Sequence, residues 1–228
     1  TENVGIGKNA LDRLTTAGGN VAIGTEAQNR NVTGDGNTAV GFQALELATA
    51  GTNTAVGYKA GEDVTSGTNN VLIGFDSGAD ALTSITTTSN NIIIGNVSSA
   101  NAEIACSWTE GSDQRDKTDI ENLPSNAGLN FVNQMRPVTY VWDKRVNYNQ
   151  PTDENWGERD HSKKSTDKQV GFIAQELKAI EESIGWSEDH IVNTSNEQSY
   201  KMMYSQVIPI LTKAIQELAA KVQVLEDA

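Results

Sequence analysis

Residues suited to metal or redox chemistry are scarce in this chain of 228 residues. Cys106 is the only cysteine, which excludes an intrachain disulfide, a thiolate metal cluster and a two-cysteine redox motif. We expect its side chain to be a small buried hydrophobe. The two histidines, His161 and His190, are far apart in the sequence, and neither belongs to an HxxxH or HExxH motif. The sequence therefore predicts no metal site and no cofactor.

Basic residues and long apolar runs are also scarce. The chain has 17 Lys and Arg against 30 Asp and Glu, a net charge of -13, and both halves carry an acidic excess. Because nucleic acids and anionic membranes attract basic surfaces, we expect neither to bind. No apolar run approaches the roughly 20 residues that a helix needs to cross a bilayer, so we also expect no membrane insertion.

Aromatic residues are sparse before residue 112, where Gly, Asn, Thr and Ala dominate. The first 111 residues contain only Phe42, Tyr58, Phe75 and Trp108, and we find no aromatic cluster there that nominates a ligand site. Tryptophan and longer apolar side chains become more frequent afterwards. This change predicts a domain boundary near residue 111, with one domain over 1–111 and a second over 112–228.

A repeated unit fills the first domain. Each copy has an asparagine, a short apolar stretch and a glycine, followed by turn residues. The steps between copies are 17, 17, 16, 17 and 21 residues, and a fixed period of this kind indicates stacked units. Stacking buries a continuous core and aligns the asparagines, which predicts a parallel β-solenoid or β-roll. The asparagines are Asn3, Asn20, Asn37, Asn53, Asn70 and Asn91.

The pattern Asn-x-Ala-Val-Gly, as in residues 37–41 and 53–57, resembles the head repeats of trimeric autotransporter adhesins and the shafts of bacteriophage tail fibres. The resemblance implies a trimeric shaft in which the inner strand faces of three chains contact each other. Two interpretations of the shaft stay open: a rigid spacer, or a surface that binds a receptor on the host cell.

The second domain mixes helix and strand signals, which predicts an α+β fold. A helical spacing covers 129–135, an alternating strand pattern covers 138–142, and the polar stretch 147–168 is typical of a mobile loop. A further helix is expected to open at Val170 and to end near Gly185.

The last element carries apolar residues three and four positions apart, which is a heptad seam. Such a seam favours helices of several chains winding into a coiled coil; the alternative is an amphipathic helix packed on its own domain. The alternation of Ile or Val with Leu favours two strands, but the seam is too short to settle their number. The seam residues are Ile208, Leu211, Ile215, Leu218, Val222 and Leu225.

Ser112 and Lys117 bring a hydroxyl and an amine close together in the sequence, and a desolvated lysine can replace histidine as the base for serine. The surrounding motifs resemble the intramolecular chaperone domain at the C-terminus of phage tailspikes and tail fibres, the S74 peptidase family. They occur in the family's order, followed by the terminal coiled coil. The motifs are Ser-Asp-x-Arg-x-Lys at 112–117, Pro-Val-x-Tyr-x-Trp at 137–142, Gly-Phe-Ile-Ala-Gln-Glu-Leu at 171–177 and the segment around Tyr204.

The resemblance implies a domain that forms a homotrimer, guides folding of the fibre and then cuts itself off between Gly111 and Ser112. Ser112 would be the nucleophile and Lys117 the general base of a single-turnover serine endopeptidase. Asp116 departs from the usual residue before the lysine. With Asp113 and Asp119 it would favour the charged form of Lys117 and weaken it as a base, unless folding buries the lysine away from them. The reaction could run within one chain or between neighbouring chains.

Two further assignments stay open at this stage. Backbone N–H groups or Arg115 could steady the oxyanion, or Arg115 could form a structural ion pair with a carboxylate. Asp113 is the other residue that could support the oxyanion or the structure of the site. The resemblance places the chain in the virion as the C-terminal part of a tail fibre or spike assembled in the host cytoplasm. The alternative is a fibre tip that trimerises or binds a receptor, for example through 147–168, without cutting itself.

Overall fold

The structure is a computed structural model that describes residues 2–79, 84–99, 103, 105, 109–149 and 153–228. Its residues divide into two compact units, one reaching to residue 104 and one containing 105–149 and 153–228. Each unit is considered by itself. Cys106, for which we expected burial, lies outside the described residues.

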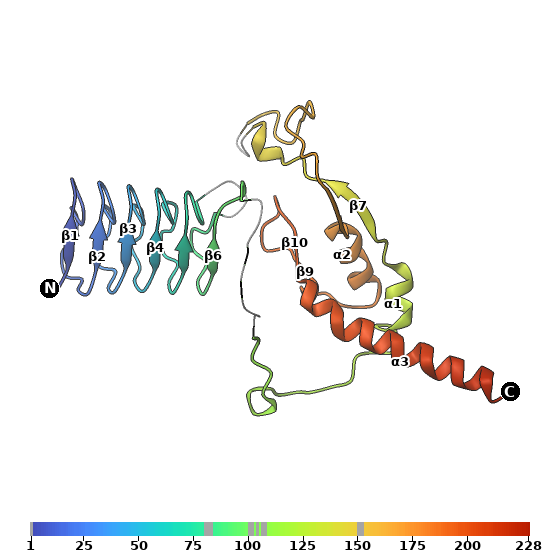
Figure 1. Ribbon diagram of the computed structural model, residues 1–228. Helices are drawn as coiled ribbons and strands as arrows, with labels where there is room; N and C mark the ends of the chain where they lie inside the picture. Colours follow the sequence, from blue (N-terminus) through green and yellow to red (C-terminus); the bar gives the residue numbers. More distant parts are fainter. Residues whose placement is uncertain (1, 80–83, 100–102, 104, 106–108, 150–152) are drawn as a thin grey trace. The chain divides into compact units, whose positions relative to one another are not determined.

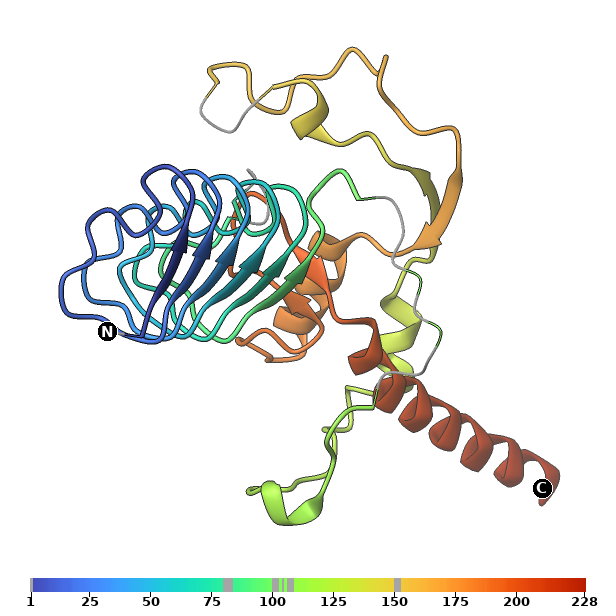
Figure 2. The same ribbon diagram turned by 60° about the vertical axis from the view of Figure 1, so that its left-hand side comes forward.

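The first unit is a parallel β-solenoid with one short strand in each coil (Figure 1). The strands form a single sheet in sequence order, and each pairs with the next in register. Figure 2 shows the strands side by side, with the turns of each coil stacked behind them. The predicted β-repeat shaft is therefore confirmed. The strands are β1 (Val4–Ile6), β2 (Val21–Ile23), β3 (Thr38–Val40), β4 (Thr54–Val56), β5 (Val71–Ile73) and β6 (Ile92–Ile94).

Small side chains fill the solenoid core because each coil is narrow. The middle residue of a strand points inward, and Ala22, Ala39, Ala55 and Leu72 are fully buried. Residues on either side of it point outward, as alternation along a strand requires. The sheet therefore has a buried inner face of alanine and leucine and an outer face of mainly Val, Ile and Thr.

An asparagine ladder runs through the solenoid beside the sheet. Asn37 shows the pattern: its Oδ1 accepts from the Asn53 backbone N over 2.9 Å, and its Nδ2 donates to the Ala50 carbonyl over 3.0 Å. Its own backbone N donates to Asn20 Oδ1 over 2.9 Å. Each asparagine thus ties one coil to the next, which confirms the predicted alignment. The buried amide of Asn37 has partners for both its oxygen and its nitrogen.

The glycine that ends each strand permits the close approach of neighbouring coils. Gly41 has a φ of +141°, and a Cβ on it would lie 2.1 Å from the Gly57 carbonyl oxygen. Gly24 and Gly57 have the same conformation and the same contact with the following coil. Only glycine meets both requirements, which explains the glycine in each repeat.

The second unit is an α+β domain with a long C-terminal helix, as predicted (Figure 1). Helix α1 packs on α3, and the two antiparallel strand pairs are β7 with β8 and β9 with β10. Its elements are η1 (Gln114–Asp116), α1 (Leu129–Gln134), β7 (Val138–Val141), η2 (Arg145–Asn147), β8 (Lys168–Gly171), α2 (Ala174–Ser183), β9 (Val192–Asn193), β10 (Lys201–Met202), η3 (Tyr204–Gln206) and α3 (Val207–Glu226).

One sequence expectation is wrong in this unit. The helix predicted from Val170 begins only at Ala174, because Lys168–Gly171 is a strand that pairs with β7. Gly171 accounts for the difference: a Cβ there would lie 2.6 Å from the Tyr204 hydroxyl, so the residue serves close packing rather than a helix start.

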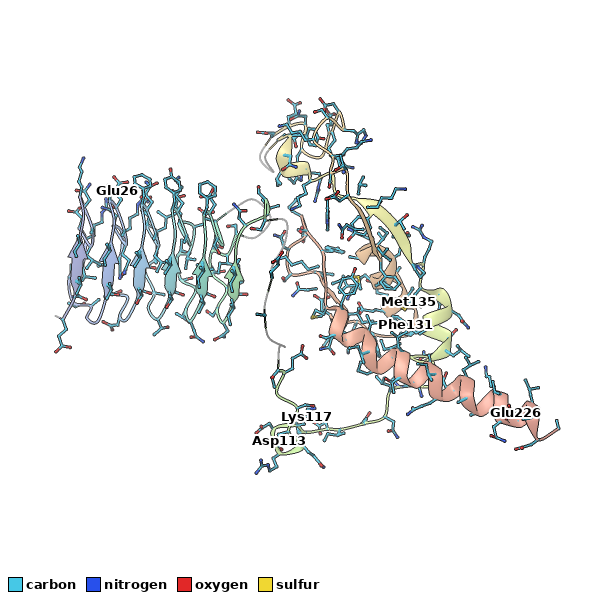
Figure 3. All side chains as sticks on the ribbon, viewed as in Figure 1. Glu26, Asp113, Lys117, Phe131, Met135 and Glu226 are labelled. Carbon is cyan, nitrogen blue, oxygen red and sulfur yellow. The ribbon has the colours of Figure 1, made fainter. Side chains whose placement is uncertain are left out.

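The core of the second unit forms where α1, α2 and the start of α3 meet. Buried apolar side chains from these elements and from β9 make one cluster, with Trp186 packed against it. Figure 3 labels Phe131 on α1 and Met135, the residue that follows the helix. In the described part of the chain, no helix is long and apolar enough to cross a membrane. The buried members are Phe131, Leu177, Ile180, Ile191, Val192, Val207 and Ile210.

Candidate functional site

The structure brings Ser112 and Lys117 together. Lys117 Nζ donates a hydrogen bond to Ser112 Oγ over 2.7 Å, within the distance that a base needs to take the proton of a nucleophile. Figure 3 labels Lys117 and the neighbouring Asp113 on the segment that precedes α1.

A single turn of 3₁₀ helix makes this contact geometrically accessible. Asp113 caps η1, with its Oδ1 accepting from the Arg115 backbone N over 2.9 Å. The Lys117 backbone N then closes the turn by donating to the Gln114 carbonyl over 3.2 Å. The chain reverses between positions 112 and 117, and the lysine side chain returns to the serine. The motif spacing thus has a local physical reason.

Arg115 is engaged with Asp113 in this turn. Its Nη2 donates to Asp113 Oδ2 over 2.6 Å, and its Nε lies 3.1 Å from Asp113 Oδ1. The guanidinium holds the pKa of the Asp113 carboxyl below its ordinary value. This pairing favours the ion-pair alternative for Arg115 over the oxyanion role, and it gives both residues the task of holding the turn.

The peptide bond before Ser112 is open to attack. Every residue from Gly111 to Asn122 is exposed, and no atom lies within 4 Å of the position that a Cβ on Gly111 would take. No ion pair joins Lys117 to a carboxylate among the described residues.

Helix α3 has two apolar stripes on different sides. One stripe packs on its own domain through Val207, Ile210 and Ala214, which are buried. The heptad seam is the other stripe, and all six of its residues are exposed, from 41% at Leu211 to 76% at Leu225. The seam is therefore not the face that packs on the domain, and it is free for another chain.

The outer face of the solenoid sheet is also apolar and exposed. Ile6, Ile23, Val56, Ile73 and Ile94 form one row along it, each at least 36% exposed. A run of aliphatic side chains across six strands is larger than the scattered apolar residues normal on a surface, which indicates a contact face.

Sequence reasoning missed an aromatic row on the solenoid. Phe42, Tyr58 and Phe75 stack on one another in successive coils and are exposed, so the view that these rings form no cluster is wrong. A signal was present: each ring directly follows the glycine of a repeat.

The histidines take part in contacts elsewhere in the second unit. His161 Nδ1 lies 2.6 Å from Asp143 Oδ2, and the His190 ring stacks on Trp186. Within the described ranges, no group of three or more His, Cys, Asp and Glu side chains is placed to hold a metal ion.

Comparison with known proteins identifies the segment that begins at this turn. The family model of peptidase S74, chaperone of endosialidase, matches residues 112–186. The resemblance drawn from the motifs is thereby confirmed for this segment. The endosialidase-chaperone match starts at Ser112, the residue that Lys117 contacts, and it ends at Trp186, before α3. No curated protein and no solved structure gives a significant match to the chain.

Proposed function

We propose that the chain is the C-terminal part of a phage tail fibre or tailspike whose endosialidase-chaperone domain, residues 112–228, drives folding of a homotrimer and then cuts itself off. The hydrogen bond between Lys117 Nζ and Ser112 Oγ carries this proposal. Cutting would occur between Gly111 and Ser112, and would leave the shaft, residues 1–111, in the virion.

The chemistry needs no bound substrate. Ser112 Oγ attacks the Gly111 carbonyl carbon while Lys117 accepts the hydroxyl proton, which gives a cyclic tetrahedral intermediate. The C–N bond then breaks as the amine nitrogen takes up that proton, leaving Gly111 as an ester on Ser112. Water hydrolyses the ester to the Gly111 carboxylate and the free hydroxyl. Because the reacting groups are adjacent in the chain, proximity lowers much of the barrier.

The exposure of Ser112 and Lys117, the proposed catalytic dyad, offers a way to regulate this reaction. A lysine acts as a base only when its ammonium is desolvated, and Lys117 is exposed in the single chain. A second chain packed over the 112–122 segment would provide the desolvation. Each chain would then cut itself once, and only after assembly, so the presence of cut chains would indicate that assembly has taken place.

Two exposed apolar surfaces support assembly of several chains. The α3 seam is free of its own domain, and the outer sheet face carries its aliphatic rows on the surface. Burying apolar surface stabilises association by roughly 25 cal/mol for each Å² removed from water, so these two surfaces are the natural contacts between chains. The number three rests on the resemblance.

Denaturing electrophoresis with intact-mass measurement tests the proposal, applied to the wild type beside Ser112→Ala. Fragments of 111 and 117 residues in the wild type alone are expected, given cutting after residue 111 of the 228. A single full-length band in both proteins would favour the alternative of a trimerisation clamp at a receptor-binding tip that stays attached.

A further inference from the structure

Four aromatic side chains of the second unit form a belt that joins three sequence motifs far apart in the chain. The ring centroids of Tyr140 and Trp142 are 5.3 Å apart with planes at 86°, and those of Phe172 and Tyr204 are 6.4 Å apart. The two pairs meet at Gly171, where a Cβ would lie 2.6 Å from the Tyr204 hydroxyl and 3.3 Å from Tyr140 Cε1. Trp142 and Tyr204 are 53% and 52% exposed, so much of this aromatic belt is on the surface.

The aromatic belt continues the heptad seam of α3. Tyr204 lies four residues before Ile208, and Leu211 follows three residues later, so Tyr204 falls on the alternation of the seam. The turn η3, which begins at Tyr204, runs directly into α3. Ile208 is itself 62% exposed. A second chain that packs on the seam therefore lies next to the aromatic belt.

The segment 112–122, which carries the dyad, is complementary to this belt. Ile120 is a large apolar side chain that is 62% exposed, and every other residue of the segment is exposed as well. The segment has four acidic residues against two basic ones. The charged side chain beside the belt is a cation, since Lys144 Nζ lies 5.8 Å from the centroid of the Trp142 ring. An acidic segment with an exposed isoleucine thus suits an apolar belt flanked by an ammonium.

The belt that this segment meets belongs to another chain. Figures 1 and 2 both show the segment that contains η1 on one side of α3, and β7 on the other. The segment therefore does not reach the belt of its own chain, whereas the seam brings a second chain beside it.

We propose that residues 112–122 of one chain dock on the aromatic belt of a second chain, with Ile120 packed against Trp142. This inference rests on the proposed function and names the surface that completes the dyad. Docking removes water from Lys117, and desolvation favours its uncharged amine. Lys144 of the second chain acts in the same direction, because a like charge nearby disfavours the ammonium. Each chain then cuts itself with the help of its neighbour.

Photo-cross-linking tests the docking apart from the cutting. The full chain carries Ser112→Ala, and Ile120 is replaced by p-benzoylphenylalanine. After irradiation, a link between chains doubles the chain mass in denaturing electrophoresis, whereas a link within one chain leaves it unchanged. We expect the doubled mass, with the link located by peptide mass spectrometry at Trp142 or Tyr204. Lack of an interchain link, or a link outside the belt, would overturn the proposal.

Ile120→Asp tests the consequence for cutting. Ile120 is exposed in the single chain, so this variant should fold and assemble, but it should cut more slowly by about tenfold or more, because the dyad is no longer held in a dry site. Asn122→Asp adds the same charge two residues further on, also at an exposed position, and is the matched control. Equal rates of fragment formation in the two variants would contradict the contact of Ile120.

Co-expression tests whether the belt acts between chains. One chain carries Trp142→Asp with an intact dyad, and the other carries Ser112→Ala with an intact belt. The Trp142→Asp chain should stay uncut alone and be cut in mixed oligomers, where it docks on the intact belt. Val170→Asp is the control: Val170 pairs with Thr139 and is 78% exposed, and alternation puts it on the other face of the strand pair, so this variant should cut normally. Cutting of Trp142→Asp alone, or no cutting in the mixture, would overturn the proposal.

The two proposals fail in different ways. If the wild type does not cut but the link from position 120 reaches the belt of a second chain, the docking holds and the self-cutting is refuted. If the wild type cuts and no such link forms, the self-cutting holds and the docking is refuted.

Discussion

Glu217 on α3 accepts a hydrogen bond at Oε2 from the backbone N of Leu129, the first residue of α1, over 2.8 Å. Lys213, one turn earlier on α3, lies 3.2 Å from the other carboxylate oxygen of Glu217. The carboxylate thus satisfies an N–H at the start of α1 that has no partner within the helix. This contact and the buried stripe fix the rotation of α3 about its axis, and the heptad seam is left exposed as a result.

Replacing Ile215 by aspartate should abolish assembly and leave the domain folded. Ile215 is 66% exposed in the single chain, so the charge costs little there, whereas in a coiled-coil seam it would be buried without a partner. We expect a loss of at least about 2 kcal/mol of association free energy for each chain, enough to give monomers at micromolar concentration. Light scattering coupled to size-exclusion chromatography measures this.

Val224→Asp is the matched control for that experiment. Val224 is 69% exposed on the same helix but lies off the seam, so its variant should assemble normally. Equal assembly of both variants would show that the seam of α3 is not the contact between chains.

Lys117→Arg should fold and assemble like the wild type and fail to cut. An arginine keeps the charge, but it stays protonated and cannot accept the proton of Ser112 Oγ. We expect the rate of fragment formation to fall at least about a hundredfold, the lower end of what a general base contributes. Electrophoresis over a time course gives the rate, and efficient cutting by this variant would remove Lys117 from the proposed dyad.

Gly41→Ala should disrupt the stack of coils. The new Cβ would lie 2.1 Å from the Gly57 carbonyl oxygen, at a φ of +141° that L-residues rarely adopt. The coils must move apart, and we expect a loss of about 3 kcal/mol or more. Gly36→Ala is the control. Its Cβ would lie 4.0 Å from the nearest atom, Thr52 Cγ2, at a φ of +68°, so this substitution should cost only about 1–2 kcal/mol. Thermal unfolding followed by circular dichroism compares the two.

The solenoid could be predicted from the sequence because its rule is local and repeated. Asn, a short apolar stretch and Gly recur at nearly constant steps, and one coil predicts the next. The aromatic row could not be predicted with the same ease, since Phe42, Tyr58 and Phe75 are 16 and 17 residues apart and meet only after the coils stack. A residue becomes part of that surface through its place in the repeat.

The second unit shows the same contrast. The heptad seam and the dyad motif are short-range patterns, and both are visible in the sequence. The start of α2 was predicted too early because pairing of β8 with β7 depends on residues about thirty positions away, and Gly171 serves the packing of Tyr204. The turn held by Asp113 and Arg115 could not be predicted either, since the sequence leaves two roles open for Arg115, support of the oxyanion or a structural ion pair.

The acid stability of the second unit should depend on Asp189. Its Oδ2 accepts from the Thr194 backbone N over 2.6 Å, and its Oδ1 accepts from Lys178 Nζ over 3.1 Å. These contacts, the Thr194 N–H first, hold the pKa of Asp189 below its ordinary value of 3.8. A lowered pKa in the folded state means that the folded protein binds the proton less tightly than the unfolded one. The stabilisation is therefore present above pH 3.8 and is lost as the pH falls through the folded-state pKa.

Asp189→Asn should consequently lower the stability of this unit at pH 7 by about 1 kcal/mol, the typical net contribution of one hydrogen bond. The difference from the wild type should shrink as the pH falls below 3.8, where the wild type loses the same charge.

All four tryptophans lie beyond residue 104, so their fluorescence during denaturant unfolding reports on this unit. Asp167→Asn, at an exposed position, is the control and should change little at either pH. A gap between Asp189→Asn and the wild type that stays constant from pH 7 to pH 2 would contradict the assignment, because a lost shape contact is independent of pH whereas a lost charge is not.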